Sequence, residues 1–97
     1  MKPLNISQAA LEDLEEAMQW YAKQDPDLPQ RLLDDVNQTI QKLHERPELG
    51  IKFPRSTERF KRTKTFPYLI IYEDRPDEVY IRAIAHQRRK PGYWRKR

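Results

Sequence analysis

The sequence predicts an α+β fold of order β-α-α-β-β-β, with a helical hairpin packed on one face of a small, mainly antiparallel sheet. Two segments in the first half repeat apolar residues every three or four positions, as amphipathic helices do. The second half instead carries apolar and aromatic runs separated by short charged turns, which is typical of strands. A length of 97 residues suits one core, so residues 1–97 are expected to form a single domain.

The chain is expected to begin with a short edge strand and a helix. Leu4 and Ile6 flank a brief alternating segment, and Ser7 is a favourable helix N-cap. Apolar residues then recur at helical spacing, so the helix should turn one face toward the core. That face comprises Ala10, Leu11, Leu14, Ala17, Met18, Tyr21 and Ala22.

A second helix should follow after a short connection. Pro26 disfavours helical geometry before it, whereas Pro29 is tolerated in the first turn of the next helix. Its apolar residues at helical spacing are Leu32, Leu33, Val36, Ile40 and Leu43. The helix should end near Arg46, because Pro47 follows. Two amphipathic helices with a short connection predict an antiparallel hairpin.

Three strands are predicted in the second half. Residues 51–58 are expected to be irregular, since Pro54 argues against a central strand. Residues 59–65 suit a strand with one wet face, and the almost continuously apolar residues 66–73 indicate the central strand. Residues 79–86 form the last strand. Alternation along it assigns Val79, Ile81, Ala83 and Ala85 to the helix side, and Tyr80, Arg82, Ile84 and His86 to an open sheet face.

Charge is divided unevenly along the chain. Residues 1–48 carry ten acids and five bases, whereas residues 49–97 carry five acids and fourteen bases, giving −5 and +9. Residues 82–97 hold seven Lys and Arg residues and no acid. This asymmetry indicates a basic surface that faces a polyanion or an acidic partner, although a solvated basic tail has the same composition.

Composition excludes several classes of function. The sequence contains no cysteine, which rules out disulfides, thiol nucleophiles and zinc–thiolate sites. Two histidines without clustered acids are poor metal ligands, and two glycines form no phosphate-binding fingerprint, so we expect no metal and no cofactor. The N-terminus lacks a signal-peptide pattern, and no apolar run reaches the roughly 20 residues that span a bilayer. We therefore expect a cytoplasmic protein without membrane contact.

The last third of the chain resembles a known toxin family. It runs Phe66-Pro67-Tyr68-Leu69-Ile70-Ile71-Tyr72, and continues after a turn as Ile81-Arg82-Ala83-Ile84-Ala85-His86-Gln87-Arg88-Arg89, followed by Tyr93-Trp94. The order and spacing of these motifs resemble the RelE/ParE superfamily of type II toxin–antitoxin modules, and most closely its ParE-like branch. Weaker matches at residues 11–21 and 43–50 extend the resemblance over nearly the whole chain.

The resemblance implies a toxin that blocks growth by binding an essential target, which is DNA gyrase for characterised ParE toxins. It also implies neutralisation by a cognate antitoxin, whose C-terminal segment folds over the toxin as a helix or an added strand, giving a hetero-oligomer. The alternative within the superfamily is a RelE-like endoribonuclease that cleaves mRNA in the ribosome. A non-toxic, small basic binding module is a further alternative.

A metal-free nuclease needs a general base, a general acid and cations for the phosphorane. The residues for these roles are Arg62, Lys64, Arg82, His86 and Tyr93. Lys64 and Tyr93 fall near positions that RelE-like nucleases use. However, Gln87 stands where their catalytic arginine is expected, so the sequence favours a binding protein over an enzyme.

The candidate target- or antitoxin-binding residues extend from the first long strand to the tail. They are Arg59, Lys61, Arg82, His86, Arg88, Arg89, Tyr93, Trp94 and Arg95. Trp94 either covers the sheet and anchors the tail or contacts the target. The cations of the tail are expected to be unpaired, so serine at Arg95, Lys96 and Arg97 should weaken binding without lowering stability.

Overall fold

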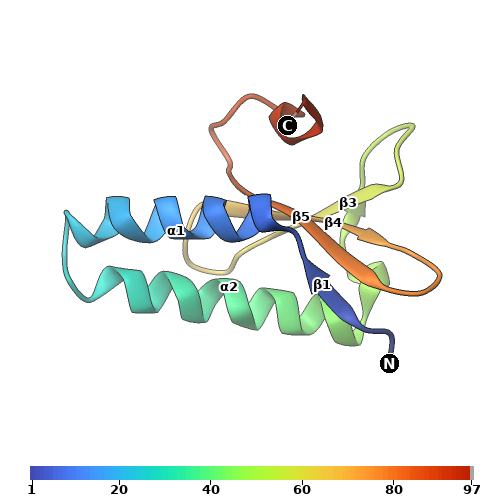
Figure 1. Cartoon of the computed structure of the whole chain (residues 1–97), viewed down its shortest axis with the longest axis horizontal. Coiled ribbons are helices and arrows are strands. Elements are labelled where there is room, and N and C mark those ends of the chain that lie inside the picture. Colours follow the sequence, from blue (N-terminus) through green and yellow to red (C-terminus); the bar gives the residue numbers. More distant parts are fainter. Residues whose placement is uncertain (97) are drawn as a thin grey trace.

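The computed structural model describes residues 1–96 and contains two helices against a five-stranded sheet (Figure 1). The elements are β1 (Leu4–Ile6), α1 (Gln8–Ala22), α2 (Leu28–Glu45), β2 (Ile51–Lys52), β3 (Glu58–Arg62), β4 (Tyr68–Asp74) and β5 (Val79–His86). Two short 3₁₀ helices, η1 (Pro47–Leu49) and η2 (Tyr93–Lys96), precede β2 and end the described chain. The predicted α+β fold is confirmed.

The sheet has the strand order β1-β5-β4-β3-β2. Strand β1 lies parallel to β5, with Leu4 opposite Val79, and all other pairs are antiparallel. Strand β2 was not predicted, because residues 51–58 were expected to be irregular. Ile51 and Lys52 nevertheless pair with Phe60 and Arg59, since the proline that argued against a strand comes two residues after the pairing ends.

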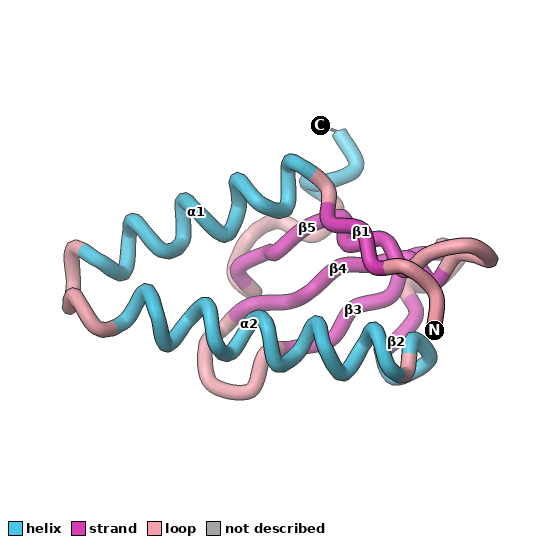
Figure 2. Tube along the Cα trace, turned by 60° about the horizontal axis from the view of Figure 1, so that its bottom comes forward, coloured by secondary structure: helices cyan, strands magenta, loops and turns pink. Residues whose placement is uncertain are grey.

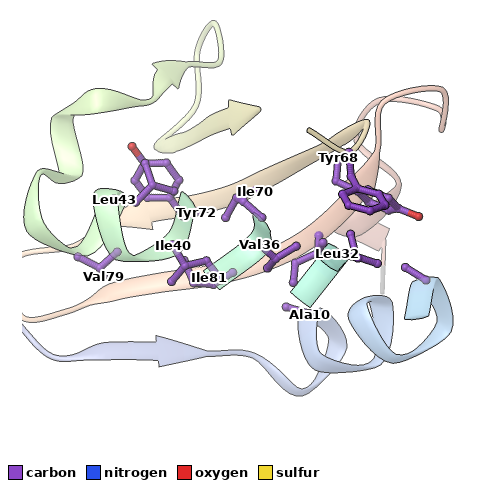
Figure 3. Packing of buried hydrophobic residues seen from close by; sticks show 13 residues of the cluster. Ala10, Leu32, Val36, Ile40, Leu43, Tyr68, Ile70, Tyr72, Val79 and Ile81 are labelled. Carbon is purple, nitrogen blue, oxygen red and sulfur yellow. The ribbon is translucent and has the colours of Figure 1, made fainter. Parts of the chain in front are cut away.

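The helical hairpin covers one face of the sheet and forms the main core with it (Figure 2). The predicted N-cap is confirmed, because Ser7 Oγ accepts a hydrogen bond from the backbone N–H of Ala10 at 3.0 Å. Helix α2 buries one side against strands β4 and β5, as Figure 3 shows at close range. Its fully or nearly fully buried apolar residues are Leu32, Val36, Ile40 and Leu43.

Helix α1 buries only part of its predicted apolar face. Ala10 and Ala17 are buried, but Leu11 is 45% exposed. The exposed apolar residues line a groove with Pro29 at the start of α2. This apolar strip comprises Leu11, Leu14, Met18, Ala22 and Pro29. Helical periodicity identified the apolar residues, but not which of them the core would bury.

Strand β5 changes its alternation in the middle because of a β-bulge. Tyr72 of β4 pairs with Ile81 and Ile71 pairs with Ala83, so Arg82 is an extra residue on β5. Val79 and Ile81 therefore face the helices as predicted, whereas Ala83 and Ala85 face the other side. Assigning Ala83 and Ala85 to the helix side, and Ile84 and His86 to the open face, was wrong, because simple alternation does not include the extra residue.

Alternation predicted that the second face of the sheet would be open, but this face is covered. Trp94 from the C-terminal end packs there in a smaller apolar cluster with Ile71, Ala83 and Ala85. In Figure 1 the C-terminal helical turn (red) lies on the opposite side of the sheet from α2. The two alanines leave room for the indole ring, which is only 3% exposed. The sheet is thus covered by the hairpin on one face and by the chain's own end on the other.

Candidate binding surface

The residues that follow β5 form a folded arm, residues 87–96, which we call the C-terminal basic segment. The backbone N–H of Gln87 donates to Pro67 O at 2.9 Å, and that of Arg89 donates to His86 O at 2.9 Å. Gly92 then reverses the chain with φ +84°, a left-handed conformation that favours glycine. This turn brings the last residues, which form η2, back onto the second face of the sheet.

A buried carboxylate from β3 holds the end of this segment. Glu58 is 4% exposed and accepts a hydrogen bond from Trp94 Nε1 at 3.0 Å. Its other oxygen accepts from Arg95, with Nε at 2.7 Å and Nη2 at 2.6 Å. Arg82, the extra residue of the bulge, places its Nε 3.6 Å from Glu58 Oε2. Two neighbouring side chains of the C-terminal basic segment and Arg82 of β5 therefore meet at one carboxylate, which also accepts from Ser56 Oγ at 3.4 Å.

A second carboxylate extends this charge network along the sheet. Glu73 accepts from Arg82 Nη1 at 3.2 Å and from Arg75 Nη2 at 3.3 Å. Burial opposes ionisation of Glu73, but the hydrogen bonds from the two arginines outweigh it and hold its pKa below the usual value. Arg75 in turn stacks over the ring of Tyr80 at 4.2 Å. The ionised form of Glu73 is therefore favoured, and its carboxylate, like that of Glu58, binds Arg82 of the bulge.

The predicted cations of β3 divide between the two faces of the sheet. Arg59 and Lys61 pair with Tyr72 and Ile70, which face the helices, and Arg59 Nη1 donates to Gly50 O at 2.9 Å. Arg62 pairs with Leu69 on the opposite side, and its Nε donates to Gln87 Oε1 at 3.2 Å. Arg62 therefore lies beside the C-terminal basic segment, whereas Arg59 and Lys61 do not.

The predicted tail residues differ in how they are held. Trp94 is buried, and Arg95 forms an ion pair with Glu58 although it is about half-exposed. Arg89 stacks its guanidinium over the ring of Tyr93 at 3.9 Å. Arg88 is exposed, and its backbone N–H donates to His86 Nδ1 at 3.1 Å. The expectation of unpaired tail cations is thus wrong for Arg95, and Arg97 lies outside the described residues.

The five residues proposed for nuclease chemistry do not converge. His86 packs edge-on against Tyr68 at 5.3 Å and lines a pocket with Tyr93, Asp13 and Glu16, near helix α1. Arg62 and Arg82 belong to the second face of the sheet. Lys64 lies in the loop before β4, where only its backbone N–H is tied, to Asp35 Oδ1 at 3.0 Å. His86 therefore shares its pocket with Tyr93, Arg89 and two acids, but not with Arg62, Lys64 or Arg82.

Tyr68 also lines this pocket and is a poor proton donor or acceptor near neutral pH. Burial, together with its contact to Tyr21, raises the pKa of Tyr68 to about 12. The ring instead packs edge-on against Tyr21 and His86. The pocket therefore combines aromatic rings with the charged side chains of Asp13, Glu16 and Arg89.

Sequence reasoning missed Glu58, which binds both Trp94 and Arg95 of the C-terminal basic segment. It is the only acid between Glu48 and Glu73, and it directly precedes a run rich in Arg and Lys. An isolated acid at the start of a basic strand is a signal that such a residue is paired within the fold. The sequence does not say with which partners, since Trp94 lies 36 residues later.

The described residues contain no candidate membrane-spanning helix and no cluster of possible metal ligands. Within residues 1–96, neither helix is long and apolar enough to cross a membrane. The same residues contain no group of three or more histidine or acidic side chains arranged to hold a metal ion.

Comparisons with known proteins give one structural match and one family match. A chain from the chromosomal ParDE toxin–antitoxin system of P. aeruginosa has a similar structure, with a TM-score of 0.77 and 18% sequence identity. The match covers 89% of this chain and 96% of that one, and at this identity it supports the fold. A search of curated protein sequences gives no match. The family model of the ParE toxin of the type II toxin–antitoxin system parDE matches residues 4–91, and the chain therefore belongs to the ParE toxin family.

Proposed function

We propose that the chain is the toxin of a type II toxin–antitoxin module and arrests growth by binding DNA gyrase. The observation that carries this proposal is the fixed position of the C-terminal basic segment, which Glu58 holds against the sheet. A cation-rich segment with a defined shape suits recognition of an acidic surface on a large partner. Membership of the ParE toxin family supports the same reading.

The separation of the nuclease candidates supports binding rather than RNA cleavage. General acid–base catalysis requires the base within hydrogen-bond reach of the reacting proton, with cations near the phosphate oxygens. His86 lies beside Asp13 and Glu16, whereas Arg82 is bound to Glu58 and Glu73 on the other face. A ribosome-dependent nuclease would need these groups on one surface.

An antitoxin is the proposed neutralising partner. Leu11 in the apolar strip on the helical hairpin is 45% exposed. Covering such an apolar surface with a partner segment lowers the free energy of the complex. The exposed acid Glu15 of α1 also lines this strip. An amphipathic antitoxin segment with basic flanks would complement both features. The toxin and antitoxin would then form a hetero-oligomer.

Induced expression in a bacterial host tests the proposal directly. Growth should stop after induction. Compared with cells that lack the toxin, gyrase-dependent DNA cleavage should differ, whereas mRNA should stay equally intact during translation. Co-expression of a small antitoxin gene adjacent to the toxin gene should restore growth. Cleaved mRNA would instead favour the RelE-like alternative, and normal growth at confirmed levels of folded protein would favour a non-toxic binding module.

A further inference from the structure

We infer that Glu58 is a positioning residue, whose buried carboxylate fixes the C-terminal basic segment on the sheet and so defines the surface offered to the target. The inference extends the proposed function, because it names the residue that sets the shape of the target-binding segment. Glu58 itself is 4% exposed, so it acts through the residues that it holds.

The buried carboxylate of Glu58 requires partners. An ionised carboxylate removed from water is stable in a protein only when donors or cations replace its hydration. Glu58 obtains these from Trp94, Arg95 and Arg82, and also from Ser56 Oγ at 3.4 Å. Trp94 and Arg95 belong to the C-terminal basic segment, so the segment and the carboxylate depend on each other.

Trp94 also depends on its contact with Glu58. Its ring is buried against Ile71, Ala83 and Ala85 and lies 5.6 Å from the ring of Phe53. A buried indole N–H requires an acceptor, and Glu58 Oε2 lies at 3.0 Å. Apolar packing thus brings the ring onto the sheet, and the hydrogen bond selects its orientation.

The position of Trp94 also determines where the neighbouring cations lie. Arg95 and Lys96 follow Trp94 in η2, and both are exposed. A held segment presents these charges in one arrangement, whereas a released segment distributes them over many. Binding to a preorganised surface loses less conformational entropy, so the held segment should bind its target more tightly.

The difference between glutamate and glutamine makes the inference testable. In Glu58→Gln, the amide oxygen still accepts the Trp94 hydrogen bond, but the NH₂ group is a donor that faces the donors of Arg95. Glu73→Gln is the matched control. It also removes a carboxylate bound to Arg82, but Glu73 makes no described contact with residues 87–96.

The experiment compares hydrogen exchange and growth arrest in these variants. In Glu58→Gln, exchange of the Trp94 indole N–H and of the amides of residues 93–96 should increase at least tenfold. Amides of β4 and β5 should be unaffected, and growth arrest should need roughly tenfold more toxin. Glu73→Gln should keep the segment protected and should arrest growth at the wild-type level. Urea unfolding of both variants shows whether the protein as a whole stays folded at the growth temperature, so that a difference in growth arrest between folded variants is assigned to the segment.

Several outcomes would overturn the inference. Unchanged protection of residues 93–96 in Glu58→Gln would show that the carboxylate does not hold the segment. A released segment with undiminished growth arrest would show that its position does not matter for the target. If Glu58→Gln does not fold, Arg95→Gln removes the half-exposed partner of Glu58 instead. It should show the same increase in hydrogen exchange of residues 93–96. If the wild-type chain itself does not arrest growth, the proposed function is wrong, and hydrogen exchange still decides whether Glu58 holds the segment.

Discussion

Arg82 and His86 lie on opposite faces of the sheet, although they are four residues apart on one strand. Arg82 is the extra residue of the bulge and binds Glu58 and Glu73, whereas His86 packs against Tyr68 on the helix side. Without the bulge, strand alternation would place both side chains on the same face. The bulge therefore separates the two residues that a nuclease would most need together.

Substitution of His86 should leave growth arrest largely intact. Loss of a catalytic base lowers the rate of an enzyme by about 10²–10⁴-fold, whereas a residue at the edge of an interface contributes far less. We expect His86→Ala to arrest growth within a few-fold of wild type, measured by titrating the inducer. Abolished arrest in a variant that circular dichroism shows to be folded would favour the nuclease alternative.

The two tryptophans should differ strongly in their contribution to stability. Trp94 is 3% exposed and bonded to Glu58, whereas Trp20 is 56% exposed. Trp94→Ala should lower the free energy of unfolding by about 3–5 kcal/mol, as is typical for buried aromatic residues. Trp20→Ala is the control and should change it by about 0.5 kcal/mol or less. Equal effects in urea unfolding would show that Trp94 is not part of the core.

The end of the chain should not behave as a uniform solvated tail. Arg95 pairs with buried Glu58, but it is itself 47% exposed, so water recovers part of the lost interaction. Arg95→Ser should therefore cost about 1–2 kcal/mol, less than the loss of a partner from a fully buried pair. Lys96→Ser should have little effect on the melting temperature. A similar melting temperature for both variants would restore the sequence-based expectation.

The apolar strip on the hairpin should contribute to antitoxin binding and not to folding. Leu11→Ser removes an exposed apolar side chain from the strip, and it should weaken antitoxin affinity by about tenfold, or roughly 1.4 kcal/mol. Ile51→Ser is the control, because Ile51 is 65% exposed on β2, outside the strip. Equal antitoxin affinities in calorimetry for both variants and wild type would place the antitoxin elsewhere.

Glu73 should make stability depend on pH in the acid range. Its pKa is lower in the folded chain than the usual value of 4.5, so the folded state favours the ionised form. Its contribution to stability is therefore fully present above the unfolded-state pKa and is lost as the pH falls through the folded-state pKa. Between neutral pH and the acid range, wild type should lose more stability than Glu73→Gln. Parallel pH profiles from urea unfolding would contradict this assignment.

Local patterns in the sequence determined the elements and most of their ends. Ser7 and Pro47 mark helix boundaries by their own backbone chemistry, and residues 79–86 alternate strongly enough to predict β5 with its observed ends. The motifs of residues 66–94 also identified the toxin family that the comparison confirms. These signals need only neighbouring residues, so they can be interpreted without knowledge of the tertiary fold.

The tertiary structure alone decided which faces the functional residues occupy. The bulge at Arg82 depends on the register between β4 and β5, and a shift of one residue moves every later side chain to the other face. The contact between Glu58 and Trp94 joins residues 36 positions apart, and periodicity carries no information about such pairs. The sequence by itself therefore determined the elements and the family, while long-range register and burial determined the site.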